Sequence, residues 1–508
     1  MRFVSLFLLL LVSATYAKSF DFDFVNKMPT SREKDYYIWR FLQQKSTTKA
    51  QAIEIVKGAK ALNTKLKKAY RNKTGHNPKL TKKPKKKPTQ AQKEAWKRKA
   101  DISKKVKKSL HPMQELLKRE ADMQTFIFNF ATAAERKKFN HILTPNQYKK
   151  LTRSRHFNKS IELIEKENLK YIKKSFLFPP ALNNALSFTT HINLALNALR
   201  NDKPDIATLY FGEARKKAKR RRSKDQTSFW LYLLTKDKIY LNSLVKSSDV
   251  NIYTLLARDR LRLQYPSVES PKFLKKRNKH YDIQDPIAWA KLKTKIFDIS
   301  IDKHKLAQDF KTQETVAHYS YIMAKAHNYQ KHYYPMPYRD VMHFLPKKRQ
   351  ALIYAIARQE SRFVPASIST SFALGMMQIM PFLVKDIAKN RGENIDLDDM
   401  FNPYHALVYA NYHLDYLESW LYNPVLVAYA YNGGIGFTKG LLTQKDLFKN
   451  RRYEPFLSME SIGVRETREY GKRVLTNYVI YLNILGQPIR ISQILKHLKD
   501  AKGVDRFR

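Results

Sequence analysis

One glutamate has the sequence surroundings of a general acid. Residues 347–362 have helical periodicity, with apolar residues on one stripe that includes Ile353 and Ile356. Glu360 continues that stripe, seven residues after Ile353 and four after Ile356. Burial disfavours the charged form of a carboxyl group, so its raised pKa would let it give a proton to a leaving oxygen near neutral pH. The alternative is a buried structural glutamate paired with Arg362.

Three further motifs follow Glu360-Ser361-Arg362-Phe363 along the chain. They are Gly375-Met376-Met377-Gln378-Ile379-Met380-Pro381, Ala430-Tyr431-Asn432-Gly433-Gly434 and Glu466-Thr467-Arg468-Glu469-Tyr470. Gly375 permits a backbone approach that a side chain would block, and Gln378 can both donate to and accept from a sugar amide or hydroxyl. Tyr431 offers a flat apolar face with a polar tip, suited to a pyranose ring. Asn432 before two glycines predicts a turn that presents backbone groups to a ligand.

With these motifs, residues 338–486 resemble the lytic transglycosylases, in particular the periplasmic soluble type with a goose-lysozyme-like catalytic domain. The resemblance implies that Glu360 is the catalytic acid and then the base. It implies a substrate-binding cleft lined or supported by Ser369, Gln378, Met380, Tyr431, Asn432 and Glu466, with Tyr470 behind Glu466. Two residues depart from the family pattern and bear on the shape of the cleft: Gly433 replaces the usual alanine, and Phe372 stands where a small residue is common.

The resemblance also implies a reaction, cleavage of the β-1,4 bond between N-acetylmuramic acid and N-acetylglucosamine without water. The glutamate would protonate the bond and then deprotonate the muramoyl 6-hydroxyl, which closes a 1,6-anhydro ring. This nucleophile is intramolecular, so its high effective concentration replaces an activated water. Two alternatives stay open: a muramidase that hydrolyses the same bond, and a non-catalytic cell-wall-binding scaffold.

Other candidate sites are weaker. Asp396, Asp398 and Asp399 form an acidic loop, but it lacks the glycine and terminal glutamate of a calcium-binding EF-hand, which favours a solvated connection. His405 and His413 are predicted to be ordinary helix-surface histidines, because no third ligand has supporting spacing. We therefore expect neither a metal nor a cofactor.

The elements that must position these residues are predicted to be helices. Only three of the 13 glycines precede residue 335, and β-type alternation is scarce, which favours stacked helices over strands. Residues 188–199 have helical spacing, and Asn201-Asp202-Lys203-Pro204 predicts a turn before a second helix. The fold class predicted is all-α, with an N-terminal α-helical superhelix or solenoid and a C-terminal lysozyme-like catalytic domain.

A chain of 508 residues is too long for one core, so several domains are expected. The boundaries predicted are a signal peptide at 1–17, a basic α-helical superhelical domain at 18–225, a helical linker domain at 226–332, the catalytic domain at 333–486 and a tail at 487–508. The sequence leaves open whether that tail is a docking helix or disordered.

Charge and the N-terminus indicate the compartment. Arg2 precedes a short apolar run that ends in small residues near Ala17, the pattern of a cleaved secretory signal. The net charge of +52 lies mainly outside residues 338–486, which hold 18 Lys and Arg against 14 Asp and Glu. Export makes nucleic acid an improbable partner, and the chain has no cysteine for a lipid anchor.

The partner expected is therefore the glycan strand of peptidoglycan, met in the periplasm by a monomeric protein. The basic segments, including the Lys-rich stretch 79–108, are predicted to be either a solvated surface or a surface attracted to the anionic wall. Peripheral contact with the cell wall or outer membrane, and contact with cell-wall synthases, are left open.

Overall fold

In the computed structural model, helices account for 62% of the residues that the structure describes. The structure describes residues 19–78, 89–444 and 447–508. Within these ranges, β-pairing is limited to isolated bridges. The prediction of an all-α fold is thus confirmed. The predicted signal peptide at 1–17 and the first part of the Lys-rich stretch, residues 79–88, lie outside the described residues. Among the described helices, none combines the length and apolar character needed to cross a bilayer.

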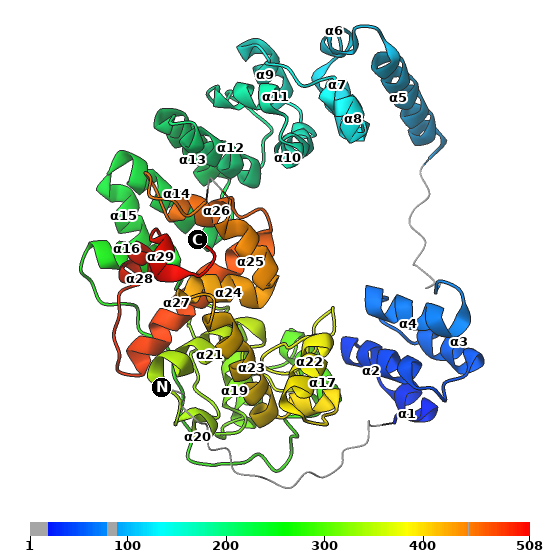
Figure 1. The fold of residues 1–508 in the computed structure, drawn as a ribbon, viewed down its shortest axis with the longest axis vertical. Coiled ribbons are helices and arrows are strands. Elements are labelled where there is room, and N and C mark those ends of the chain that lie inside the picture. Colours follow the sequence, from blue (N-terminus) through cyan, green and yellow to red (C-terminus); the bar gives the residue numbers. More distant parts are fainter. Residues whose placement is uncertain (1–18, 79–88, 445–446) are drawn as a thin grey trace.

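Four short helices form an N-terminal group, drawn in blue in Figure 1. They are α1 (Phe22–Lys27), α2 (Arg32–Gln43), α3 (Lys49–Lys57) and α4 (Thr64–Thr74). Ser31 caps α2 by accepting from the backbone N–H of Lys34, and Gly75 ends α4 in the left-handed conformation. Helix α2 is buried along most of its length because other elements cover it on several sides.

The helices that follow are arranged along a curved path (Figure 1). They are α5 (Gln90–Lys108), α6 (Pro112–Leu117), α7 (Ala121–Phe130), α8 (Ala133–Lys137), α9 (Pro145–Thr152), α10 (Phe157–Glu167), α11 (Lys170–Lys174), the 3₁₀ helix η1 (Ser175–Leu177), α12 (Phe188–Arg200), α13 (Pro204–Lys217), α14 (Arg221–Thr235), α15 (Lys238–Val245) and α16 (Ile252–Arg260). Helices α12 and α13 pack together with the predicted turn between them. Successive pairs bury their apolar faces against one another, as expected for a helical array.

A small helical unit links this array to the C-terminal third. It contains α17 (Pro286–Phe297), α18 (Lys303–Gln308) and α19 (Val316–Ala326), which enclose a separate apolar core. The indole ring of Trp289 on α17 packs edge-on against the ring of His318 on α19, with centroids 5.6 Å apart. Both side chains are buried.

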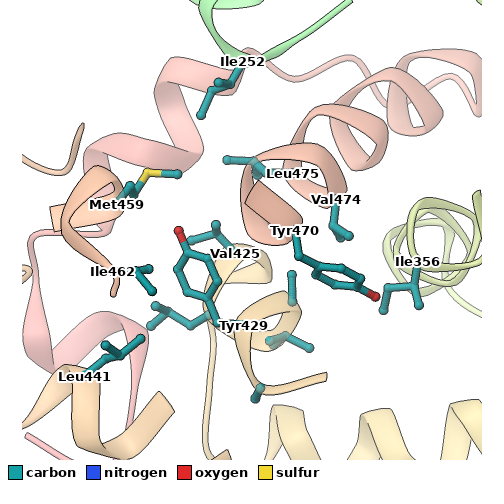
Figure 2. Packing of buried hydrophobic residues seen from close by; sticks show 14 of the residues in the cluster. Ile252, Ile356, Val425, Tyr429, Leu441, Met459, Ile462, Tyr470, Val474 and Leu475 are labelled. Carbon is teal, nitrogen blue, oxygen red and sulfur yellow. The ribbon is translucent and has the colours of Figure 1, made fainter. Parts of the chain in front are cut away.

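The C-terminal third is built around two helices, α21 and α27. Its elements are α20 (Arg339–Met342), α21 (Lys347–Glu360), α22 (Pro381–Arg391), the 3₁₀ helix η2 (Leu397–Phe401), α23 (Pro403–Glu418), α24 (Pro424–Gly433), α25 (Ile435–Leu442), α26 (Phe456–Ser461) and α27 (Arg465–Ile484). Ile356 of α21 and Val474 of α27 are fully buried in this core, which Figure 2 shows from close by. Helix α21 packs tightly on α27, and this packing fixes the two helices relative to each other.

Residues 487–508 form docking helices, which answers the question that the sequence leaves open. They contain α28 (Ile491–His497) and α29 (Ala501–Val504). The backbone N–H of Ser492 donates to Asp259 Oδ2 at 2.9 Å, and that of Ile491 donates to Tyr265 Oη at 2.8 Å. The first of these acceptors lies on α16, so the end of the chain packs back on the helical array.

Candidate active site

Glu360 is the last helical residue of α21. The sequence predicts a helix to residue 362, but Arg362 and Phe363 have φ of 56° and 67°, which a right-handed helix cannot include. The preceding stripe is fully buried, as Ile353 and Ile356 show. The chain therefore turns away directly after the carboxylate, and Glu360 lies at the edge of the core rather than inside it.

The carboxyl group of Glu360 is held by a tyrosine. Tyr470 Oη donates a hydrogen bond of 2.6 Å to Glu360 Oε1. Tyr470 reaches the site from α27, and Figure 2 shows its ring lying across the core toward Ile356 of α21. Tyr470 was expected behind Glu466, whereas the structure places it in direct contact with the proposed acid.

Burial raises the pKa of Glu360 to about 7. The hydrogen bond from Tyr470 opposes this rise, and the negative charge of Glu466 adds to it. Glu466 itself is exposed on the first turn of α27. A carboxyl group with this pKa has both protonation states populated near neutral pH, as an acid that becomes a base requires.

Arg362 does not neutralise Glu360. Its guanidinium lies over the rings of Tyr321 and Tyr329, 5.0 and 5.1 Å from their centroids. Within the described ranges no ion pair joins it to Glu360. The interpretation of Glu360 as half of a structural ion pair is therefore not supported, and its pKa is raised rather than lowered.

Ser369 and Gln378 belong to one folded loop, residues 367–380, in which short β-bridges pair Leu374 with Ile368 and Ile379. Ser369 Oγ accepts from the backbone N–H of Ala373 at 2.8 Å. Met380, partly buried, caps the N-terminus of α22 and ends this loop. The two predicted cleft residues are thus held by the loop's own hydrogen bonds.

Gln378 has less freedom than expected. Its Nε2 donates to the carbonyl oxygens of Ser367 at 3.0 Å and Gly375 at 2.8 Å. Since an amide nitrogen has two hydrogens, a ligand would be met by the amide oxygen. Gly375 has a φ of 73°, and a Cβ there would lie 2.0 Å from the carbonyl oxygen of Met400. Its close backbone approach is therefore to η2.

Tyr431 connects the loop 367–380 to helix α24. Its Oη donates to the carbonyl oxygen of Met377 at 2.9 Å, and Ser361 Oγ donates to that of Met376 at 2.7 Å. Burial, and then the charge of Glu360, raise the pKa of Tyr431 well above its usual value. The loop, Tyr431 and Glu360 therefore belong to one connected site.

Asn432 lies inside helix α24 rather than in the predicted turn. Its Oδ1 accepts from Thr467 Oγ1 at 2.8 Å, which joins α24 to α27. The turn comes at Gly434, with a φ of 88°. At Gly433, where the family resemblance implies alanine, a Cβ would lie 2.9 Å from Phe437 Cδ1. The phenylalanine ring takes up the space that an alanine methyl group would need.

Two expectations about neighbouring residues are wrong. His413 is partly buried, with its ring 5.7 Å from that of Tyr431, and burial lowers its pKa to about 4. The acidic loop is not solvated either, because Asp396 and Asp398 form ion pairs of 2.6 and 2.9 Å with Arg40 of α2. Sequence spacing gave no signal for either contact, since Tyr431 lies on the next helix, α24, and Arg40 lies 356 residues before Asp396.

No cluster of three or more side chains suited to a metal ion occurs in the part of the chain that the structure describes.

Comparison with known proteins shows what the region around the site is similar to. Residues 346–453 match the family model of the transglycosylase SLT domain. A Haemophilus influenzae protein described as a soluble lytic murein transglycosylase is 30% identical over 173 residues. That match covers 32% of this chain and 28% of the relative, so it spans less than a third of the relative's length.

Two solved structures are similar over most of the chain. The lytic transglycosylase Slt of Pseudomonas aeruginosa, as an inactive mutant, has 17% identity and a TM-score of 0.46, with 91% of this chain and 74% of that chain covered. The 70 kDa soluble lytic transglycosylase of Escherichia coli has 15% identity and a TM-score of 0.47, with 96% and 90% covered. The matched region includes Glu360, the loop 367–380 and Tyr431, so these site residues lie in the part of the chain that is similar to the transglycosylase SLT domain.

Proposed function

We propose that this protein is a peptidoglycan lytic transglycosylase that cleaves the β-1,4 bond between N-acetylmuramic acid and N-acetylglucosamine and forms 1,6-anhydromuramoyl ends. The observation that carries the proposal is the Glu360 carboxyl group, which has a pKa raised to about 7 and lies within the SLT domain. Its biological role would be remodelling and turnover of the cell wall.

In the proposed mechanism Glu360 acts twice. Its protonated form donates the proton to the glycosidic oxygen as the bond breaks. The resulting carboxylate then takes the proton of the muramoyl 6-hydroxyl, whose oxygen bonds to C1 and closes the ring. Tyr470 can hold the carboxylate in place through the 2.6 Å hydrogen bond during this second step. The proton returns to the enzyme, so no water is consumed.

A neighbouring cavity favours an anionic substrate. Its volume is about 460 Å³, and it lies between the helical array and α21 and α27, beside Gln359. Its lining includes the cations Arg222, Lys331, Arg358, Arg362, Lys472 and Arg473 against the anions Asp249 and Glu469. These six cations against two anions give the lining an excess of positive charge. Burial is the main cause that lowers the pKa of Arg473 in this lining, and the charge of Arg222 lowers it further. Carboxylates carried by peptidoglycan would relieve that excess.

The test is digestion of purified peptidoglycan followed by mass analysis of the released fragments. We expect fragments one water lighter than those with a reducing end, and none of them from the Glu360→Gln variant. Substantial turnover by that variant would contradict the assignment of the acid. Binding of peptidoglycan by the unmodified protein with no cleavage would favour the scaffold alternative.

A hydrolytic muramidase is the second candidate function, because the charge of Glu466 reaches Glu360. An inverting or retaining hydrolase needs a second carboxylate for the attacking water or for the sugar. Reducing-end products, together with loss of turnover in Glu466→Gln, would support hydrolysis. For the lyase we expect Glu466→Gln to keep most of its turnover.

Location and partners are part of the same proposal. The predicted signal peptide at 1–17 would deliver the protein to the periplasm, where glycan strands are its substrate. Detection of a mature protein that begins near residue 18 in the periplasmic fraction would support this. We propose no metal or organic cofactor for the reaction.

A further inference from the structure

The N-terminal helices contact the loops of the SLT domain, more than 300 residues further along the chain. Arg40 of α2 forms ion pairs with Asp396, Nη2 to Oδ2 at 2.6 Å, and with Asp398, Nη1 to Oδ1 at 2.9 Å. These three side chains are only 9%, 10% and 13% exposed. Tyr36 Oη also donates to Asp398 Oδ1 at 2.8 Å. A charge network this shielded is weakly screened, and loss of one partner leaves the others uncompensated.

The same helix encloses Phe372, the residue that departs from the family pattern. Its ring centroid is 5.4 Å from that of Trp39 and 5.9 Å from that of Tyr36, and only 1% of its surface is exposed. Phe372 has a φ of 60°, which is unfavourable for a bulky residue. The aromatic contacts from α2 can keep the backbone in this conformation. Without α2, a large apolar side chain in this loop would face water.

Two hydrogen bonds fasten the flanks of the same loop. Arg32 Nη1 donates to the carbonyl oxygen of Ile368 at 3.2 Å, and Asn63 Nδ2 donates to that of Thr370 at 2.8 Å. Ile368 and Thr370 are the immediate neighbours of Ser369, a predicted cleft residue. The N-terminal group therefore contacts the loop both through the loop's backbone carbonyl groups and through the side chain of Phe372.

The loop transmits these contacts to the cleft. The backbone N–H of Phe372 donates to the carbonyl oxygen of Ser369 at 3.1 Å. Gly375 packs on Met400 of η2, the element that also carries Asp398. The far side of the loop is bound by Tyr431 through Met377. Helix α2 and Tyr431 thus hold the loop from opposite sides.

We propose that α2 is a positioning element of the active site, in which Tyr36, Trp39 and Arg40 hold Phe372 and η2 so that Ser369 and Gln378 keep their places in the glycan cleft. This role rests on the proposed function, because it assumes that the cleft binds a glycan. None of the three residues is a catalytic residue, since they act through the loop. The segment 19–78 is then part of the catalytic unit, although it precedes the SLT domain by the whole helical array.

Two measurements on the full-length protein test the proposal. The first is hydrogen exchange of the backbone amides of 367–380, which needs no substrate. We expect faster exchange in Arg40→Ala and Trp39→Ala and near-normal exchange in Arg40→Lys. The control Arg71→Ala removes an exposed arginine of α4 from the same N-terminal group and should leave the loop unchanged. Unchanged exchange in both alanine variants would overturn the positioning role.

The second measurement is peptidoglycan turnover. A displaced loop should lower kcat/KM on the order of tenfold to a hundredfold, mainly through a higher KM, with the pH profile of Glu360 unmoved. Phe372→Leu, a milder change than Phe372→Ala, guards against general unfolding, which thermal melting would reveal. Faster loop exchange with unchanged KM would overturn the link to the cleft. Absence of turnover in the unmodified protein would refute the proposed function and leave the exchange result to decide the positioning of the loop.

Discussion

Removing the charge of Glu360 should stabilise the fold at alkaline pH. The carboxyl group has a folded-state pKa of about 7 against an ordinary value of 4.5, mainly because it is buried. Between these two values the folded protein retains a proton that the unfolded chain releases. The free energy of unfolding therefore falls as pH rises from about 4.5 to about 7 and levels off above it. The variant Glu360→Gln has no such group to titrate.

The size of the effect follows from the two pKa values. One pKa unit corresponds to about 1.4 kcal/mol, so the charged carboxylate costs the fold up to about 3 kcal/mol above pH 7. Glutamine has nearly the same shape, and its amide oxygen can still accept from Tyr470. Below about pH 4, where both the folded and the unfolded protein hold Glu360 protonated, the two proteins should be about equally stable.

Thermal or urea unfolding measured from about pH 3.5 to about pH 8.5 provides the assay. We expect the stability difference, variant minus unmodified protein, to rise from near zero below about pH 4 to a plateau above about pH 7. The exposed Glu466, changed to glutamine, is the graded comparison: it removes only the charge that adds to the raised pKa of Glu360, so we expect a smaller rise in the same direction. A difference that is constant with pH, or a variant less stable at pH 8, would refute the buried-acid interpretation.

Three further outcomes are expected. Tyr470→Phe removes a hydrogen bond that lowers the pKa of the proposed acid, so the alkaline limb of kcat/KM should move to higher pH. Glu466→Gln removes a charge that raises the same pKa, so its limb should move to lower pH; equal or reversed shifts would contradict the electrostatics. Gly375→Ala would place a methyl group 2.0 Å from a carbonyl oxygen and should cost roughly 3 kcal/mol or more in urea unfolding, against about 1 kcal/mol for Gly392→Ala, where the left-handed backbone meets open space.

Local periodicity was sufficient to predict the helices and the burial of the acid. The stripe that includes Ile353 and Ile356 is buried, and Glu360 at its end has the raised pKa expected from desolvation. The turn between α12 and α13 was predictable for the same reason, since Pro204 and its neighbours act on their own backbone. These features depend on residues within about two helical turns of each other.

Features that depend on distant partners were missed. The end of α21 was predicted two residues late, because the positive φ of Arg362 and Phe363 comes from packing and not from glycine or proline. The contact of Tyr470 with Glu360 joins helices 110 residues apart. The acidic loop resembles a solvated connection until Arg40, 356 residues upstream, is placed beside it.

Phe372 shows how such a long-range contact can still leave a trace in the sequence. A bulky apolar residue in a surface loop, at a position where the family resemblance implies a small one, is unfavourable unless something covers it. The structure supplies the cover from α2, through Trp39 and Tyr36. The departure from the family pattern and the charge on the adjacent acidic loop therefore have one physical cause. Phe372 and the acidic loop both face the N-terminal helices, and the sequence alone could not identify their partners there.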